Sequence, residues 1–238
     1  MSEFTDRSSS TVVVCTHLHA SIISKPSYNG EKRLRTRSIN SGGSSKCSEN
    51  SIEELRRSPL KKYLYIFKRI WVQLLNIILI YTVSLSIFPA LNARILSTDN
   101  LLSERYFAPV FCFLFFNLFA TVGNGIAQYF PVIKAKYLII FSVLRIGFIP
   151  FFLYCNYLPS DTLPRTAPVI FTHDWMYIVG AVAMAVSSGY LSSLVMMYIP
   201  KCVHAELSAT AGMFAALTII LGILVGINIS LIYPTLVL

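Results

Sequence analysis

Five long apolar segments constrain this chain of 238 residues more than any other feature. Each is close to the roughly 20 residues that an α-helix needs to cross about 30 Å of hydrocarbon. In lipid the backbone must satisfy its own hydrogen bonds, and a helix does so within one segment. We expect spans at about residues 70–90, 107–129, 137–157, 176–198 and 211–234. The sequence therefore predicts an all-α, polytopic helical membrane protein.

The charged residues are few and unevenly placed. They make up 13% of the chain, against about 25% in soluble proteins, and the net charge of +9 belongs mainly to the N-terminal third. That third is rich in Ser, Thr and Asn and cannot bury enough apolar surface to offset its ordering entropy. We expect residues 1–66 to be a disordered basic cytosolic region and residues 67–238 to form a five-span transmembrane domain.

The positive charges also predict an orientation, because an excess of Lys and Arg marks the cytosolic side. Lys134 and Lys136 lie between the second and third spans, and Lys201 lies between the fourth and fifth. We expect these connections and the N-terminus in the cytosol, and the C-terminus outside. The basic tract is interpreted as contact with the lipid bilayer and not with nucleic acid, since no nucleic-acid-binding motif accompanies it.

Two serines of the basic region resemble phosphorylation sites. Ser38 follows an arginine at a distance of three residues, and Ser58 lies in the sequence R-R-S-P. Phosphate at either serine would reduce the attraction of this region to an anionic leaflet. An unmodified linker is the alternative interpretation.

Polar side chains follow one face of the second span. Asn117, Thr121, Asn124 and Gln128 are separated by four, three and four residues, which is the spacing of one helix face. Such a stripe either makes hydrogen bonds to neighbouring helices or lines an aqueous path for a solute. Amides donate and accept hydrogen bonds, so these four residues are candidate substrate-binding residues.

The third span carries a full charge, Arg145, within the stretch L-R-I-G-F-I-P-F-F-L-Y-C-N. Arg145 lies nine residues beyond Lys136, which places it roughly 13 Å into the membrane at about 1.5 Å per residue. Buried arginines in membranes face a bundle interior or a wet cavity, so Arg145 is the fifth candidate substrate-binding residue. Its counter-charge is absent, replaced by carbonyls and amides, or supplied by another chain. Pro150 should bend the same helix.

Small residues recur every four positions in the last two spans, which lets neighbouring helices approach closely. We expect close packing at Ala181, Ala185, Gly189 and Ser193 in the fourth span, and at Gly212, Ala216, Gly222 and Gly226 in the fifth.

Neither cysteines nor catalytic motifs indicate an enzyme. The five cysteines are far apart, without the paired spacing of a zinc site or a disulfide framework. The chain has no nucleophile elbow, zinc-protease motif, phosphate-binding loop or paired intramembrane carboxylates. We expect neither enzymatic activity nor a metal or other cofactor.

Several stretches together resemble the C-terminal half of the equilibrative nucleoside transporter family. They occur in collinear order over about residues 69–238: S-L-S-I-F-P (84–89), E-R-Y-F-A-P-V-F-C-F-L-F-F-N-L-F (104–119), L-R-I-G-F-I-P-F-F-L-Y-C-N-Y (144–157), F-T-H-D-W-M-Y-I (171–178), S-G-Y-L-S-S-L (188–194) and A-T-A-G-M (209–213). The resemblance implies a cytosolic loop followed by spans seven to eleven of eleven. It also implies half of a bundle similar to that of the major facilitator superfamily.

The second span departs from the pattern of that family at two positions. The family pattern F-N-x-x-D-x-x-G-R reads F-N-L-F-A-T-V-G-N here, so Asn117 and Gly123 match. Ala120 replaces the acid and Asn124 replaces the base, and both residues are implicated in solute recognition within the family. The two charges are lost together, as a mutually paired couple would be.

The resemblance implies facilitative transport of nucleosides or nucleobases by a plasma-membrane protein of which this chain is a C-terminal part. The expected partners are the missing N-terminal half or another transporter chain. A non-transporting membrane protein that binds and regulates full-length relatives is the alternative, and a homodimeric carrier is a third possibility.

Overall fold

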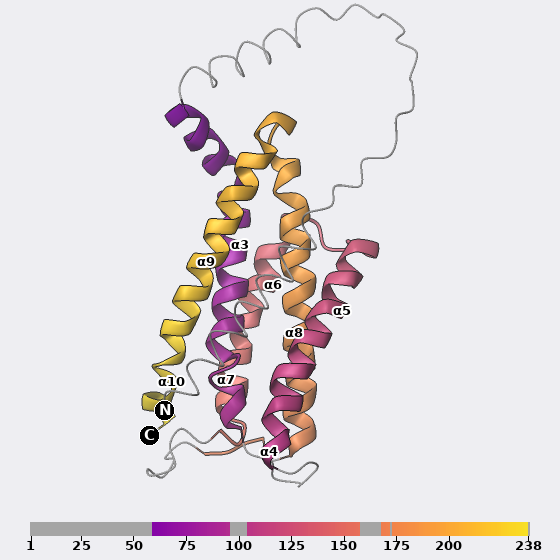
Figure 1. Ribbon diagram of the computed structural model, residues 1–238, viewed down its shortest axis with the longest axis vertical. Coiled ribbons are helices and arrows are strands. Elements are labelled where there is room, and N and C mark those ends of the chain that lie inside the picture. Colours follow the sequence, from indigo (N-terminus) through magenta and orange to yellow (C-terminus); the bar gives the residue numbers. More distant parts are fainter. Residues whose placement is uncertain (1–58, 96–103, 158–167, 172, 238) are drawn as a thin grey trace, which may run out of the picture. The chain divides into compact units, whose positions relative to one another are not determined.

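A computed structural model describes residues 59–95, 104–157, 168–171 and 173–237 of this chain (Figure 1). The chain divides after residue 63, and the description below concerns residues 64–238 together with the first residues of α3. The helices are α3 (Pro59–Ile87), α4 (Glu104–Phe107), α5 (Phe115–Tyr129), α6 (Leu138–Leu144), α7 (Phe148–Leu153), α8 (Asp174–Tyr198), α9 (Ser208–Ser230) and α10 (Tyr233–Val237). A π-helical segment, Ala108–Leu114, joins α4 to α5.

Within the described residues, four helical stretches are long and apolar enough to cross a membrane. They contain α3, α5, α8 and α9, and a fifth apolar stretch, Leu138–Leu153, is shorter. The expectation of a polytopic helical membrane protein is confirmed. The third segment differs from the expected span of 137–157, because its helical stretch ends at Leu153 and is interrupted at Arg145–Gly147.

The first helix begins earlier than expected. α3 starts at Pro59, whereas the sequence placed the end of a disordered region at residue 66 and the first span near residue 70. Residues 59–66 were therefore wrongly assigned to the disordered region. Leu60, Tyr63 and Leu64 stand at i, i+3 and i+4, the spacing of one face of a helix. Pro59 occupies the first turn, where its missing N–H is tolerated. The rest of the expected basic region, including Ser38 and Ser58, lies outside the described residues.

The third segment is interrupted halfway. α6 ends at Leu144, a tight 3-10 turn covers Arg145–Gly147, and α7 begins at Phe148. Pro150 lies in the first turn of α7, and its ring nitrogen cannot donate to the carbonyl of Ile146 inside the 3-10 turn. The expected irregularity therefore occurs one turn before the proline, at Arg145.

The interior consists of two apolar clusters. One includes Phe88, Phe152, Tyr177 and Met184, and the other includes Ile70, Leu138, Leu194 and Ala211. α3 and α8 are the most buried spans: 56% and 50% of the residues in their most apolar stretch are buried, against 28% in α5 and in α9. α3 and α8 are therefore central, and α5 and α9 are peripheral.

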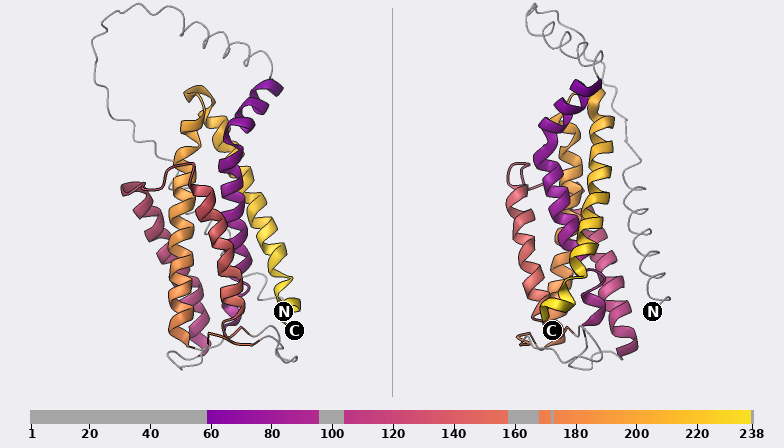
Figure 2. Two further views of the ribbon diagram at one scale, coloured as in Figure 1. Left: turned by 180° about the vertical axis from the view of Figure 1, so that it is seen from behind. Right: turned by 90° about the vertical axis from the view of Figure 1, so that its left-hand side faces the viewer.

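α9 packs closely on α3, side by side in both views of Figure 2. A Cβ at Gly226 would lie 2.8 Å from the carbonyl oxygen of Thr82, and a Cβ at Gly222 would lie 3.0 Å from the Cβ of Tyr81. The expected contact at these glycines is confirmed. The same expectation is wrong for Gly212 and Ala216, which are exposed on the outer side of α9.

Candidate functional site

The polar stripe of α5 begins with two residues bonded to their own helix. The Nδ2 of Asn117 donates to the carbonyl oxygen of Phe113 at 2.8 Å, and the Oγ1 of Thr121 donates to that of Asn117 at 2.8 Å. Asn117 is half-buried and Thr121 is exposed. These two residues thus lie at the edge of the bundle, and each of the two bonds runs to a carbonyl oxygen four residues earlier in the same helical stretch.

Asn124 is the member of the stripe that reaches another helix. It is buried, and its Oδ1 accepts a hydrogen bond from the Oγ of Ser193 on α8 at 2.8 Å. Gln128, one turn further on, is exposed. The stripe therefore contains one helix–helix contact, at Asn124, and one exposed edge, at Thr121 and Gln128.

Two glycines bring α5 and α8 into backbone contact beside this stripe. A Cβ at Gly123 would overlap the carbonyl oxygen of Val186, and a Cβ at Gly189 would overlap that of Ala120. Close approach of this kind is typical of small residues between membrane helices. It confirms the close-packing face expected at Gly189 and fixes the polar stripe along the seam with α8.

Arg145 lies in a different place, between α3 and α8. It is 2% exposed, and its Nη1 donates to the carbonyl oxygen of Met184 at 3.1 Å and to the Oγ of Ser187. Its Nη2 donates to the Oγ of Ser84 on α3 at 2.8 Å, and the Nε has no partner in the described part of the chain. Carbonyl and hydroxyl oxygens therefore surround the charge. This resembles the alternative in which carbonyls and amides replace the counter-charge, with hydroxyls in place of the amides.

The Arg145 group forms a polar layer between the two apolar clusters. On α8, Ser187 falls between the residues of one cluster and those of the other, and on α3 Ser84 lies directly after Val83, at the margin of the first cluster. The Oγ atoms of Ser84 and Ser188 lie 2.9 Å apart and extend the layer. We define Arg145, Ser84, Ser187 and Ser188 as the arginine layer.

The five predicted residues do not form one site. Ser187 touches Arg145, while Gly189 touches α5, and at about 100° per residue these positions lie roughly 200° apart around α8. The stripe on α5 and the arginine layer are consequently on opposite sides of α8. The sequence showed a period within each helix, and it contained no signal for which neighbour each face meets.

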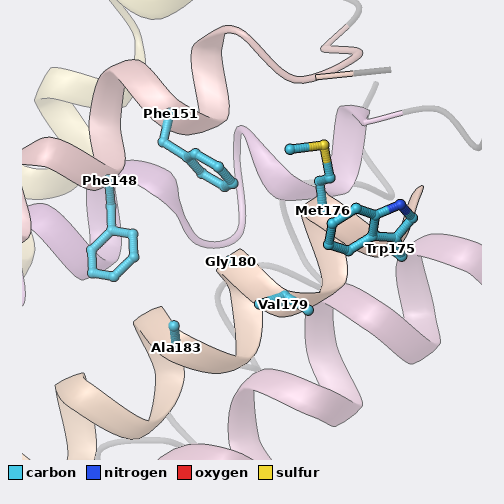
Figure 3. A pocket seen from close by; sticks show the side chains of 7 residues that line it. All are labelled: Phe148, Phe151, Trp175, Met176, Val179, Gly180 and Ala183. Carbon is cyan, nitrogen blue, oxygen red and sulfur yellow. The ribbon is translucent and has the colours of Figure 1, made fainter. Parts of the chain in front are cut away.

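A groove outside both polar groups lies between α7 and α8 (Figure 3). It has a volume of about 230 Å³ and is lined by Phe148, Phe151, Trp175, Met176, Val179, Gly180 and Ala183. Figure 3 shows the phenylalanines of α7 facing the α8 residues across it. The lining has no side-chain amide, hydroxyl or charge, and the indole N–H of Trp175 is its one polar side-chain group, so this groove lacks the set of polar groups that nucleoside recognition needs.

Among the residues that the structure describes, no three His, Cys, Asp or Glu side chains gather as they would around a metal ion. Cys112 and Cys155 form no disulfide and are buried in the apolar interior, where cysteine acts as a small hydrophobic residue.

The model of the family described as nucleoside transporter matches residues 9–234. The equilibrative nucleoside transporter 2 of Rattus norvegicus is 30% identical over 194 residues, which cover 79% of this chain and 41% of that protein. The equilibrative nucleoside transporter 1 of Homo sapiens is 34% identical over 176 residues, which cover 72% of this chain and 38% of that protein.

The matched region thus represents about two-fifths of the length of these curated relatives. The match to the family model, residues 9–234, includes all the described helices up to the start of α10. With a family model that matches most of its length and relatives at these identities, the chain belongs to the equilibrative nucleoside transporter family.

Proposed function

We propose that this chain forms the C-terminal part of a facilitative transporter, which moves nucleosides or nucleobases down their gradient. The observation that carries the proposal is the open polar edge of α5, where Thr121 and Gln128 are exposed beside the seam with α8. The relatives named as transporters support transport over the regulatory alternative.

The exposed edge has a physical consequence in a membrane. Most other exposed side chains of α5 are apolar, among them Leu118, Val122 and Ile126. These suit lipid, whereas the exposed amide of Gln128 would lack hydrogen-bond partners if it faced lipid. The hydroxyl of Thr121 is bonded to the carbonyl of Asn117, so it is the amide of Gln128 that favours a border with water or another protein surface along this edge. Amide and hydroxyl groups there match the hydroxyls of a ribose and the edges of a base.

The protein surface that faces this edge of α5 across the solute path belongs, in our proposal, to an N-terminal half of the transporter. Related halves of transporters rock against each other around a site near the membrane midplane. The lengths of the relatives support such a half, since the match covers 41% of one and 38% of another. The chain then supplies one wall of the solute path. The arginine layer stabilises that wall, because its hydrogen bonds join the third segment to α3 and α8.

We also propose that the connections at 130–136 and 199–207 face the cytosol, that the C-terminus faces outside, and that the protein resides in the plasma membrane. The orientation follows from Lys134, Lys136 and Lys201. Five spans place the two ends of the transmembrane region on opposite sides.

Uptake of radiolabelled uridine or adenosine in transporter-deficient cells tests this function. The cells should produce this chain joined to the six upstream spans that its relatives imply. Saturable uptake above that of empty cells is expected. Background uptake by a correctly inserted, full-length fusion would contradict the proposal, and co-purification with a full-length relative would then favour the regulatory alternative.

A further inference from the structure

One end of the bundle gathers positive charge from three separate segments. Lys68 and Arg69 lie on α3, Lys134 and Lys136 lie between α5 and α6, and Lys201 lies between α8 and α9; all five are exposed. In residues 64–69, 130–137 and 199–207, the only acid is Glu206. Figure 1 shows the two connections at the same end of the helices.

Hydrogen bonds hold these segments together. The hydroxyl of Tyr198 on α8 donates to the carbonyl oxygen of Ile133 at 2.9 Å, and the Nζ of Lys201 lies 5.4 Å from the centre of the Tyr198 ring. Tyr198 therefore lies between Lys201 and the residue that precedes Lys134. A cation at this distance is attracted by the ring but keeps its charge and its exposure.

α3 is joined to both connections in the same way. The Nε of Arg69 donates to the carbonyl oxygen of Cys202 at 3.2 Å, and the Nε2 of Gln73 donates to that of Ala135 at 3.4 Å. Ala135 lies between Lys134 and Lys136. The acceptors are neutral carbonyls, so the bonds position the cations without neutralising them.

The same connection exposes apolar side chains beside its lysines. Tyr129, Phe130 and Val132 are 81%, 66% and 78% exposed. The hydroxyl of Tyr190 donates to the carbonyl oxygen of Phe130 at 3.0 Å and accepts from the N–H of Val132 at 3.3 Å, which fixes this turn. Aromatic residues at the end of a span, followed by lysines, suit the boundary between acyl chains and headgroups.

We propose that Lys134, Lys136 and Lys201, with Arg69, form a binding site for the headgroup of an anionic phospholipid. The exposed Phe130 and Val132 enter the acyl boundary, and the ammonium and guanidinium groups above them meet the phosphate. Charge complementarity carries the choice of ligand, because positive charges that converge from three segments fit an anionic headgroup and not a zwitterionic one. The site is separate from the solute path and does not depend on transport.

Retention of fluorescent phosphatidylserine and phosphatidylcholine by the purified chain in mixed micelles tests this site. The wild-type chain should retain phosphatidylserine preferentially. Lys134→Gln combined with Lys136→Gln should weaken that preference by about 5-fold or more, since each lysine near an anionic surface contributes about that factor. Arg94→Gln combined with Arg105→Gln removes the same charge from the connection between the first and second spans, which is not part of the cluster, and should leave the preference close to that of the wild type.

Tyr198→Phe is the second variant, because it keeps every charge and removes the hydroxyl that holds Ile133. It should weaken the preference by about 2- to 5-fold, the effect of one hydrogen bond. Helix content and monodispersity confirm that each variant is folded. Equal retention of the two lipids by the wild type, or an equal loss in the Arg94 and Arg105 control, would overturn the proposal. An unchanged preference in Tyr198→Phe would overturn the positioning of the cations by this network.

Discussion

The Nη2 of Arg145 donates a hydrogen bond to the Oγ of Ser84 at 2.8 Å, from the break in the third segment to the middle of α3. Ser84 directs its own proton to the carbonyl oxygen of Ile80 at 2.7 Å, so the Oγ of Ser188, 2.9 Å away, is the donor in that pair. One arginine thereby connects three helices at the level where two apolar clusters meet. A charge without a carboxylate partner in the described bundle is thus held by carbonyl and hydroxyl dipoles, with the ring of Phe148 centred 5.8 Å from its Cζ.

The connection between Arg145 and Ser84 predicts energetic coupling. Ser84→Ala and Arg145→Lys should each lower the free energy of unfolding by about 1–2 kcal/mol, since lysine cannot reach Ser84 and Ser187 at once with a planar fork. The double variant should cost less than the sum, by about 0.5–2 kcal/mol, because both changes remove the same bond. Unfolding of the purified chain in detergent measures this cycle, and strictly additive effects would contradict the connection.

The seam between α5 and α8 predicts opposite outcomes for two glycines of α5. Gly123→Ala places a methyl group against the carbonyl oxygen of Val186, so the helices must separate, and we expect a loss of about 1–3 kcal/mol. Gly125→Ala is the matched control, because no atom outside its local helix lies within 4 Å of its Cβ position. It should be neutral or stabilise the helix by up to about 1 kcal/mol. Thermal unfolding in detergent compares the two, and similar destabilisation would argue against the seam.

The open edge of α5 predicts a loss of transport without a loss of stability. In the joined, transporting chain, Thr121→Val and Gln128→Leu should each reduce uridine uptake by about 5-fold, the effect of one hydrogen bond to the solute. Leu118→Val is the control, because Leu118 is 52% exposed on the lipid-facing side and should leave uptake unchanged. Equal uptake by all three variants, at equal amounts in the membrane, would remove Thr121 and Gln128 from the path.

The proposed orientation is tested by cysteine labelling. In a chain with Cys15, Cys47 and Cys202 replaced by serine, Lys134→Cys should react only with a reagent admitted to the cytosol. Thr235→Cys, exposed near the other end of the bundle, should react with a membrane-impermeant reagent in intact cells. Labelling of both positions from the same side would contradict an odd number of crossings between them and the assigned sides.

The sequence by itself determined which segments are helical and which polar residues share a helix face. Apolar length predicted the spans, because lipid leaves the backbone little choice but to bond within its own helix. The spacing of Asn117, Thr121, Asn124 and Gln128 predicted one stripe, because the helical period is a local property. The small residues at Gly189 and Gly222 likewise predicted close contact, although the same pattern was misleading at Gly212.

Tertiary structure alone decided what each face meets. Asn124 bonds to Ser193 while Thr121, one turn away, is exposed, and Arg145 lies across α8 from both. The physical reason is that the helical period fixes angles within one rod, whereas the neighbour at each angle is set by packing between residues far apart in the chain.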